Sequence, residues 1–162
     1  MLDLYETGQL AALEVDVYYR TEWDEFWSFV GSKANKRWTW CIVEHNSGLV
    51  IAWQNGDRSA ATLQKLLDLV EHLPIRVCYT DNWAAYSKLL PQKYAHIIGK
   101  DNTWKIERKN LNFRTHLKRL NRKTICFSKD KDIHDNVIGM YIEKYYFKSG
   151  TFADYFKSNK RA

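Results

Sequence analysis

The sequence is poor in proline and glycine, the two residues that mark linkers and low-complexity segments. Its 162 residues include only two prolines and seven glycines, while 45% of the residues are apolar and 15% are aromatic. This composition excludes a linker-rich chain, and it supplies enough apolar material for a hydrophobic core. A chain of this length is expected to form one globular domain.

Cysteine is also scarce, and its three copies form no metal-binding pattern. Cys41, Cys78 and Cys126 are odd in number, lie far apart and are flanked by apolar or aromatic residues. The lack of a C-x-x-C pair argues against a zinc site, and the sequence predicts reduced core thiols in a cytoplasmic protein. No long apolar run or signal peptide is present, so we expect neither a membrane span nor export.

Acidic residues are nearly missing from one segment. Residues 100–131 contain eleven Lys and Arg but only three Asp and Glu, whereas the whole chain has a net charge of +6. A basic surface of this kind attracts a polyanion, usually a nucleic acid and less often an anionic membrane. No amphipathic basic anchor is present, which favours nucleic acid. Glu107 is the one carboxylate in the most basic stretch, KIERKNLNFRTHLKRLNRK.

Hydrophobic periodicity and turn signals predict an α/β fold whose mixed five-stranded sheet is flanked by helices, in the order β-β-β-α-β-α-β-α. The three strands expected first are antiparallel and lie at 22–30, 37–45 and 48–54. Ser59 is expected to cap a helix that ends near Pro74. The remaining elements are a strand at 75–81 parallel to the first, a helix at 82–90, a strand at 93–100, and helices at 103–121 and 132–147. Residues 21–147 thus form the predicted domain, between a lead-in segment at 1–20 and a frayed tail at 148–162.

Three carboxylates are expected to meet on this fold. Asp81 ends the parallel strand, Asp24 lies in the first strand beside it, and the helix at 103–121 would bring Glu107 to the same end of the sheet. Three such charges repel one another by about 4 kcal/mol per pair at 4 Å and an effective dielectric near 20. Divalent Mg²⁺ or Mn²⁺ relieves this repulsion, and two ions can clamp the reacting oxygens of a phosphodiester. Each residue also has an ordinary structural interpretation, as a turn or cap residue or as an ion-pair partner.

Several blocks together resemble the catalytic region of the bacterial insertion element one family of transposases. These blocks are EWDEFWSFVGSKANKRW, YTDNWAAY, IIGK, IERKNLNFRTHLKRLNRKTICFS and HDNVIG, between Glu22 and Phe147. That family is similar to the wider group of DDE transposases and integrases with a ribonuclease H-like fold. The resemblance implies that Asp24, Asp81 and Glu107 are the catalytic, metal-binding residues. It also implies a catalytic role for Arg114, the basic residue seven positions after the glutamate.

The resemblance covers only the catalytic part of such transposases. Full-length members carry an N-terminal zinc ribbon and helix-turn-helix that recognise the element's ends, and this sequence has no cysteine pairs for them. The resemblance therefore implies that an upstream reading frame supplies DNA recognition in a fusion protein. It further implies an oligomer on transposon-end and target DNA, in the cytoplasm and on the nucleoid.

The basic segment supplies the residues expected to contact DNA. Those predicted to hold the phosphate backbone are Lys105, Arg108, Lys109, Arg114, Lys118, Arg119, Arg122 and Lys123. Two tryptophans near the carboxylates, Trp83 and Trp104, are predicted to stack on a base. The other predicted strand tryptophans, Trp23, Trp27, Trp38, Trp40 and Trp53, are expected to pack the sheet. His116 is expected at the surface, and His134 is expected to cap or pair locally.

The leading functional prediction is a transposase catalytic domain that cuts DNA at the element end and joins the freed 3′-hydroxyl to target DNA. Both steps are in-line phosphoryl transfers. One alternative is a truncated or non-catalytic DNA-binding fragment that inhibits transposition. Another is a ribonuclease H-like nuclease or resolvase that acts on branched DNA.

Overall fold

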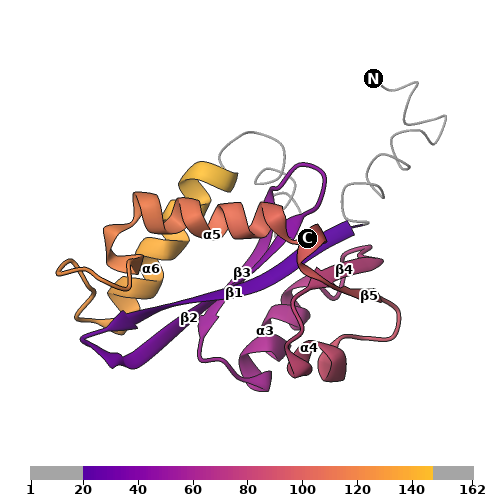
Figure 1. Cartoon of the computed structure of the whole chain (residues 1–162), viewed down its shortest axis with the longest axis horizontal. Coiled ribbons are helices and arrows are strands. Elements are labelled where there is room, and N and C mark those ends of the chain that lie inside the picture. Colours follow the sequence, from indigo (N-terminus) through magenta and orange to yellow (C-terminus); the bar gives the residue numbers. More distant parts are fainter. Residues whose placement is uncertain (1–19, 148–162) are drawn as a thin grey trace, which may run out of the picture.

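The computed structural model describes residues 20–147, and their elements form one five-stranded sheet with helices on both faces (Figure 1). The predicted tail and nearly all of the predicted lead-in segment lie outside the described residues. Strand order in the sheet is β3-β2-β1-β4-β5. The strands are β1 (Arg20–Val30), β2 (Ser32–Glu44), β3 (Val50–Gly56), β4 (Val77–Thr80) and β5 (Ala95–Ile98).

The first three strands form an antiparallel meander, as their alternating pattern predicts. β1 and β2 are joined through Gly31 alone, whose φ of 73° is accessible to glycine at little steric cost. β4 and β5 pair in parallel on the other side of β1, because each follows a helical crossover. The predicted element order and the parallel pairing of the fourth strand with the first are confirmed.

Helices divide the core into two clusters, one on each face of the sheet. On one face lie α3 (Ala60–Val70) and α4 (Ala84–Leu89), with Trp23, Trp40 and Leu63 fully buried beneath them. The Ser59 hydroxyl accepts from the backbone N–H of Thr62 at 3.3 Å, so the predicted cap of α3 is confirmed. On the other face lie α5 (Trp104–His116) and α6 (Lys131–Ile142). Among the described residues, no helix is long and apolar enough to span a membrane.

The helix predicted at 103–121 is shorter than expected. It ends at His116, Leu117 is extended, and a separate 3₁₀ turn, η2 (Lys118–Leu120), follows. This break keeps Leu120 fully buried while the chain turns back toward β1, where Ser128 forms a bridge with Val30. Another 3₁₀ turn, η1 (Lys100–Asn102), precedes α5. The predicted basic helix is therefore two elements in different orientations.

The last helix also differs from its prediction at 132–147. Its regular part ends at Ile142 and continues as the π-helical turn η3 (Glu143–Phe147). Ile133 and Met140 are 57% and 67% exposed, whereas Ile138 is fully buried. The buried residues of α6 are His134, Ile138, Tyr141 and Ile142.

One single-residue prediction is wrong, and another is confirmed in one of its two forms. Cys41 and Cys78 are buried as expected, but Cys126 is exposed because it lies in the irregular connection after η2. His134 does not cap α6, since the Asp130 carboxylate accepts from the backbone N–H of Ile133 at 2.8 Å. The predicted local pairing is confirmed, because His134 Nδ1 lies 2.8 Å from the Ser128 hydroxyl. The His134 ring is fully buried, and its Nε2 also contacts the Ser28 hydroxyl.

Candidate active site

Asp24 lies in the middle of β1 on the face covered by α5. Strand alternation places Glu22, Asp24, Phe26 and Ser28 on this face, and Phe26 stacks on Phe113 of α5 with ring centroids 5.3 Å apart. The opposite face of β1 carries Trp23 and other residues of the α3 side. Asp24 is therefore partly buried between the sheet and α5.

Asp81 directly follows β4, which runs parallel to β1. Glu22 is paired with Tyr79 in the sheet, so continuing the same register by two residues sets Asp81 beside Asp24. Neighbouring strands lie about 4.8 Å apart. The Asp81 carboxylate accepts from the backbone N–H of Trp83 at 3.1 Å, which orients it at the start of the next loop.

Glu107 projects from the first turn of α5 and is exposed. Its Oε1 lies 3.4 Å from the Thr103 hydroxyl, which can donate to it, so the carboxylate bends back toward the start of the helix. The structure thus gathers the three predicted carboxylates from β1, the end of β4 and α5 in one region.

The pKa of Asp24 is affected by the charges of the other two carboxylates. Burial raises the pKa of Asp24 from 3.8 to about 7, and the charges of Glu25, Asp81 and Glu107 add to the increase. Glu25 itself has a raised pKa, again mainly because of burial, although bonds from the Tyr86 hydroxyl and Arg58 oppose the shift. Negative charge is therefore concentrated between the middle of β1 and the carboxyl end of β4, as an oxygen-liganded cation would require.

The donor set fits a divalent cation, although its side chains are turned toward protein partners. Within residues 20–147, no three His, Cys, Asp or Glu side chains lie close enough together to form a metal cage. Asp24 Oδ2 accepts from Asn110 Nδ2 at 2.7 Å. Asn110 Oδ1 is buried and has no protein partner. These oxygen donors match the preference of Mg²⁺ and Mn²⁺.

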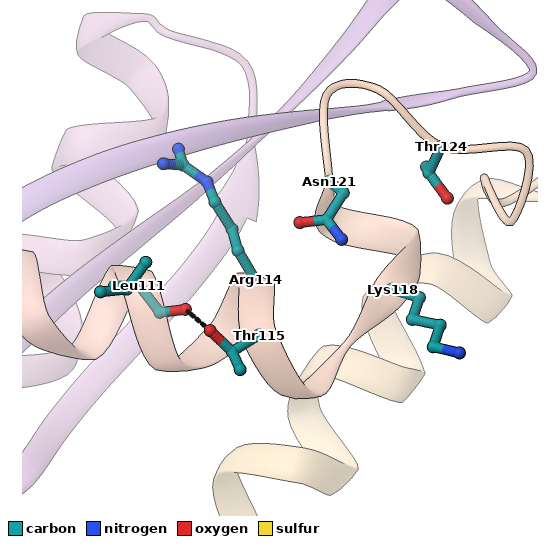
Figure 2. Close-up of a pocket in the computed structure, with 6 residues that line it drawn as sticks. All are labelled: Leu111, Arg114, Thr115, Lys118, Asn121 and Thr124. Carbon is teal, nitrogen blue, oxygen red and sulfur yellow. Dashed lines mark hydrogen bonds between the residues drawn. The ribbon is translucent and has the colours of Figure 1, made fainter.

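Arg114 lies two turns after Glu107 on α5 and reaches toward the sheet (Figure 2). Its guanidinium lies 5.7 Å from the centre of the Phe26 ring, and its Nε is buried without a protein partner. Burial lowers the pKa of Arg114, and the Asp24 charge opposes that shift. Arg114 Nε is therefore a donor that no described protein group satisfies.

A cavity of about 500 Å³ opens beside Arg114. It is lined by Leu111, Arg114, Thr115, Lys118, Asn121 and Thr124, from α5, η2 and the following loop. Arg114 and Lys118 point in different directions around it, because the helix ends between them. The cavity presents cations, hydroxyls and an amide, which are groups that bind phosphates and sugars.

The other predicted DNA contacts do not form one continuous face. Arg108, Lys118, Arg122 and Lys123 are exposed. Others are engaged within the protein: Lys105 donates to the carbonyl of Asn46 at 2.6 Å, Lys109 lies 3.9 Å from the centre of the Tyr146 ring, and Arg119 donates to the Ser128 hydroxyl at 3.3 Å. Arg122 is exposed, but its guanidinium lies 4.6 Å from the centre of the Trp27 ring. The basic segment therefore contains cations with a protein partner and the exposed Arg108, Lys118 and Lys123.

The two tryptophans predicted to stack on bases differ in accessibility. Trp104 is 55% exposed at the start of α5. Trp83 packs against Trp40 with centroids 5.2 Å apart, and Arg58 lies over its ring at 4.9 Å. Trp104 is therefore the more accessible of the two.

The tryptophans predicted to pack the sheet fall into two groups. Trp23 and Trp40 are fully buried, whereas Trp27, Trp38 and Trp53 are only partly buried. His116 is exposed as expected and bonds to the Tyr141 hydroxyl.

Sequence reasoning missed two polar residues that contact this region. Glu22 is fully buried, and Asn110 is 6% exposed and bonds to Asp24. Their positions carried a usable signal, because Glu22 precedes Asp24 by two residues on one strand face and Asn110 follows Glu107 by three on one helix face. Neither pattern reveals which partner the side chain binds.

Solved structures with the same architecture are integrase cores. The catalytic core domain of HTLV-2 integrase, solved in complex with magnesium, has a TM-score of 0.50 at 17% identity, covering 78% of this chain and 83% of that one. A simian T-cell lymphotropic virus intasome, solved with the PP2A regulatory subunit B56 gamma, contains a chain with a TM-score of 0.54 at 16% identity, covering 78% and 47%. The protein therefore has the ribonuclease H-like fold.

The class of DDE nucleic-acid-cutting enzymes follows from the relatives in sequence. Residues 17–148 match the family model of the IS1 transposase. The InsB protein of insertion element iso-IS1n from Shigella dysenteriae is 46% identical over 126 residues, covering 78% of this chain and 95% of that protein. An InsB protein of IS1 from Escherichia coli K12 is 41% identical over 127 residues, covering 78% and 75%. The chain belongs to the IS1 transposase family, as a DDE transposase catalytic domain.

Proposed function

We propose that Asp24, Asp81 and Glu107 are the catalytic carboxylates of this transposase domain and hold two divalent ions, Mg²⁺ or Mn²⁺. The observation that carries the proposal is the parallel register of β1 and β4, because it sets Asp24 beside Asp81 while α5 carries Glu107 over the same face. The ions would supply an activated water or 3′-hydroxyl and would stabilise charge on the phosphodiester oxygens.

The protein's own groups have separate roles in this proposal. Asp24 and Asp81 are fixed by the sheet, so they define the position of the scissile phosphate. Glu107 must rotate away from Thr103 to complete the site, since its carboxylate now points back along the helix. The guanidinium of Arg114, which reaches toward Phe26 and whose buried Nε has no protein partner, would orient a phosphate oxygen.

DNA is the proposed substrate, as both transposon end and target. The exposed cations Arg108, Lys118, Arg122 and Lys123 hold its backbone in this proposal. Recognition of the element's ends comes from an upstream reading-frame region joined to this chain, and catalysis takes place in an oligomer assembled on DNA.

The test is DNA cleavage and strand transfer by the fusion protein that carries Asp24→Asn, Asp81→Asn or Glu107→Gln. Each change preserves size while removing a charge, and each should lower the rate by more than about 100-fold, because even residues that only orient metal ligands cost 10–100-fold. Asp68→Asn, exposed on α3 at the opposite face of the sheet, is the matched control and should retain activity. Near-normal strand transfer by any of the three variants would remove that residue from the site.

A further inference from the structure

Helix α5, which carries Glu107, begins without a side-chain cap of its own. Thr103 stands at the N-cap position, but its side chain makes no capping bond, and its hydroxyl instead lies near the Lys100 carbonyl and the Glu107 carboxylate. The first N–H groups of a helix have no partner within the helix and must find one elsewhere.

The missing cap comes from β1. Glu22 Oε2 accepts from the backbone N–H of Ile106 at 2.9 Å, and the Glu22 side chain is fully buried. Its other oxygen, Oε1, lies 2.7 Å from His45 Nδ1, and the His45 ring packs on Tyr79 with centroids 4.8 Å apart. Both carboxylate oxygens are therefore occupied by protein partners, so Glu22 is not a free metal ligand. Its negative charge also suits the positive end of the helix dipole.

A second bond joins the same two elements further along. Asp24, two residues after Glu22, accepts from Asn110, four residues after Ile106. Two residues of strand span about 6.6 Å, and four residues of helix rise about 6 Å, so the two bonds fit one register of α5 on β1. Figure 1 shows α5 lying along β1. Glu107 lies between the two attached positions of the helix.

We infer that Glu22 is a positioning residue for Glu107, acting through the N-terminus of α5. This inference rests on the proposed role of Glu107 as a metal ligand. Loss of the Glu22 carboxylate frees the first turn of α5, whereas the bond between Asp24 and Asn110 holds only the following turn. Glu107 is then no longer held in one position relative to Asp24 and Asp81, so the affinity for the metal falls.

Two substitutions distinguish the effect of the hydrogen bond between Glu22 and the Ile106 N–H from the effect of side-chain size. Glu22→Gln keeps a carbonyl oxygen that can accept from the Ile106 N–H, while Glu22→Leu fills similar space without an acceptor. Ser59→Ala is the matched control, because it removes the cap of α3, a helix that carries none of the proposed site residues. Each chain is tested by Mn²⁺ titration and by amide hydrogen exchange.

The inference predicts that Glu22→Leu weakens Mn²⁺ binding by about 10–100-fold, as expected for a residue that orients a metal ligand. Glu22→Gln should bind Mn²⁺ much more tightly than Glu22→Leu, close to the wild-type affinity. Ser59→Ala should bind Mn²⁺ like the wild type. Equal weakening by Glu22→Leu and Ser59→Ala, or no recovery in Glu22→Gln, would overturn it.

Hydrogen exchange in the wild-type chain tests the bond whether or not the variants fold. The Ile106 amide should exchange more slowly than the amides of Trp104 and Lys105, although all three lie in the first turn of α5. Equal exchange at the three amides contradicts the role of Glu22. A wild-type chain that protects Ile106 but binds no Mn²⁺ would instead contradict the proposed metal site.

Discussion

At the scale of single residues, a buried histidine joins the far end of β1 to the start of α6. His134 Nε2 lies 2.9 Å from the Ser28 hydroxyl, and Nδ1 lies 2.8 Å from the Ser128 hydroxyl. A neutral imidazole has one donor and one acceptor nitrogen, which two hydroxyls can satisfy together. Burial lowers the pKa of His134, while the Asp135 charge opposes the shift.

The lowered pKa predicts that acid destabilises the fold through His134. Below the ordinary value of 6.5 the unfolded chain binds a proton that the folded chain resists, so the free energy of unfolding falls as pH drops through this range. His134→Gln should reduce stability near pH 7.5 by about 1–3 kcal/mol, because a buried polar group loses a partner. It should also lose less further stability than the wild type between pH 7.5 and 5.

Urea unfolding at several pH values measures both effects. Val137→Ala, a change on the same helix that introduces no titrating group, should follow the wild-type dependence on pH. Identical pH slopes for the wild type and His134→Gln would contradict this account of His134.

At the scale of elements, the end of α5 at His116 gives the basic residues before and after it different surroundings. Arg114 belongs to the helix and reaches toward Phe26 and the carboxylates, whereas Lys118 belongs to η2 and is exposed. A continuous helix would have aligned Arg114 and Lys118 on one stripe with Glu107. The break therefore separates a residue that faces the site from one that faces solvent.

This separation predicts different effects for two alanine variants. Arg114→Ala should reduce the single-turnover cleavage rate more than DNA affinity, because its guanidinium is positioned beside the carboxylates. Lys118→Ala should reduce affinity and lower the slope of log affinity against log salt by about 0.9, the effect of one lost phosphate contact. The measurements are a salt titration of DNA affinity and single-turnover cleavage. A loss of affinity in Arg114→Ala with an unchanged cleavage rate would reverse this assignment.

The sequence predicted the strands well because each has a buried face and its pattern repeats every two residues. Strand order followed from the crossover before Val77–Thr80, and this order brought Asp24 next to Asp81. The end of α5 was not predictable, because Leu117 and Leu120 continue the helical period without glycine or proline. The chain after this end returns to β1 and pairs there through Ser128 and Val30, a tertiary contact that periodicity does not encode.

The missed site residues have a similar explanation. Periodicity identifies the face on which a side chain lies, but not the atom that it bonds. Glu22 and Asn110 were on predicted faces, yet their partners came from another element. The prediction that Cys126 is buried failed for a related reason. The apolar neighbours Ile125 and Phe127 suggest a core segment, whereas Ile125 is 95% exposed.

At the scale of the whole molecule, opposite charges lie around the middle of the central strand β1 and the end of β4. Asp24, Asp81 and Glu107 lie where β1, β4 and α5 meet, and the cations of α5, η2 and the next loop lie beside them. Asp24 lies on β1, Asp81 directly follows β4, and helix α5 supplies Glu107. The arrangement suits a strand of DNA that is held by its phosphates and cut beside the carboxylates.

The most direct test of this account is a Mn²⁺ titration of the chain with bound DNA, followed by electron paramagnetic resonance. We expect two ions per chain, magnetically coupled because paired catalytic ions lie about 4 Å apart. Asp81→Asn should abolish the coupled signal, while Asp68→Asn should leave it unchanged. A single uncoupled ion, or a coupled signal that survives Asp81→Asn, would contradict the proposal that Asp24, Asp81 and Glu107 form the metal site of this transposase.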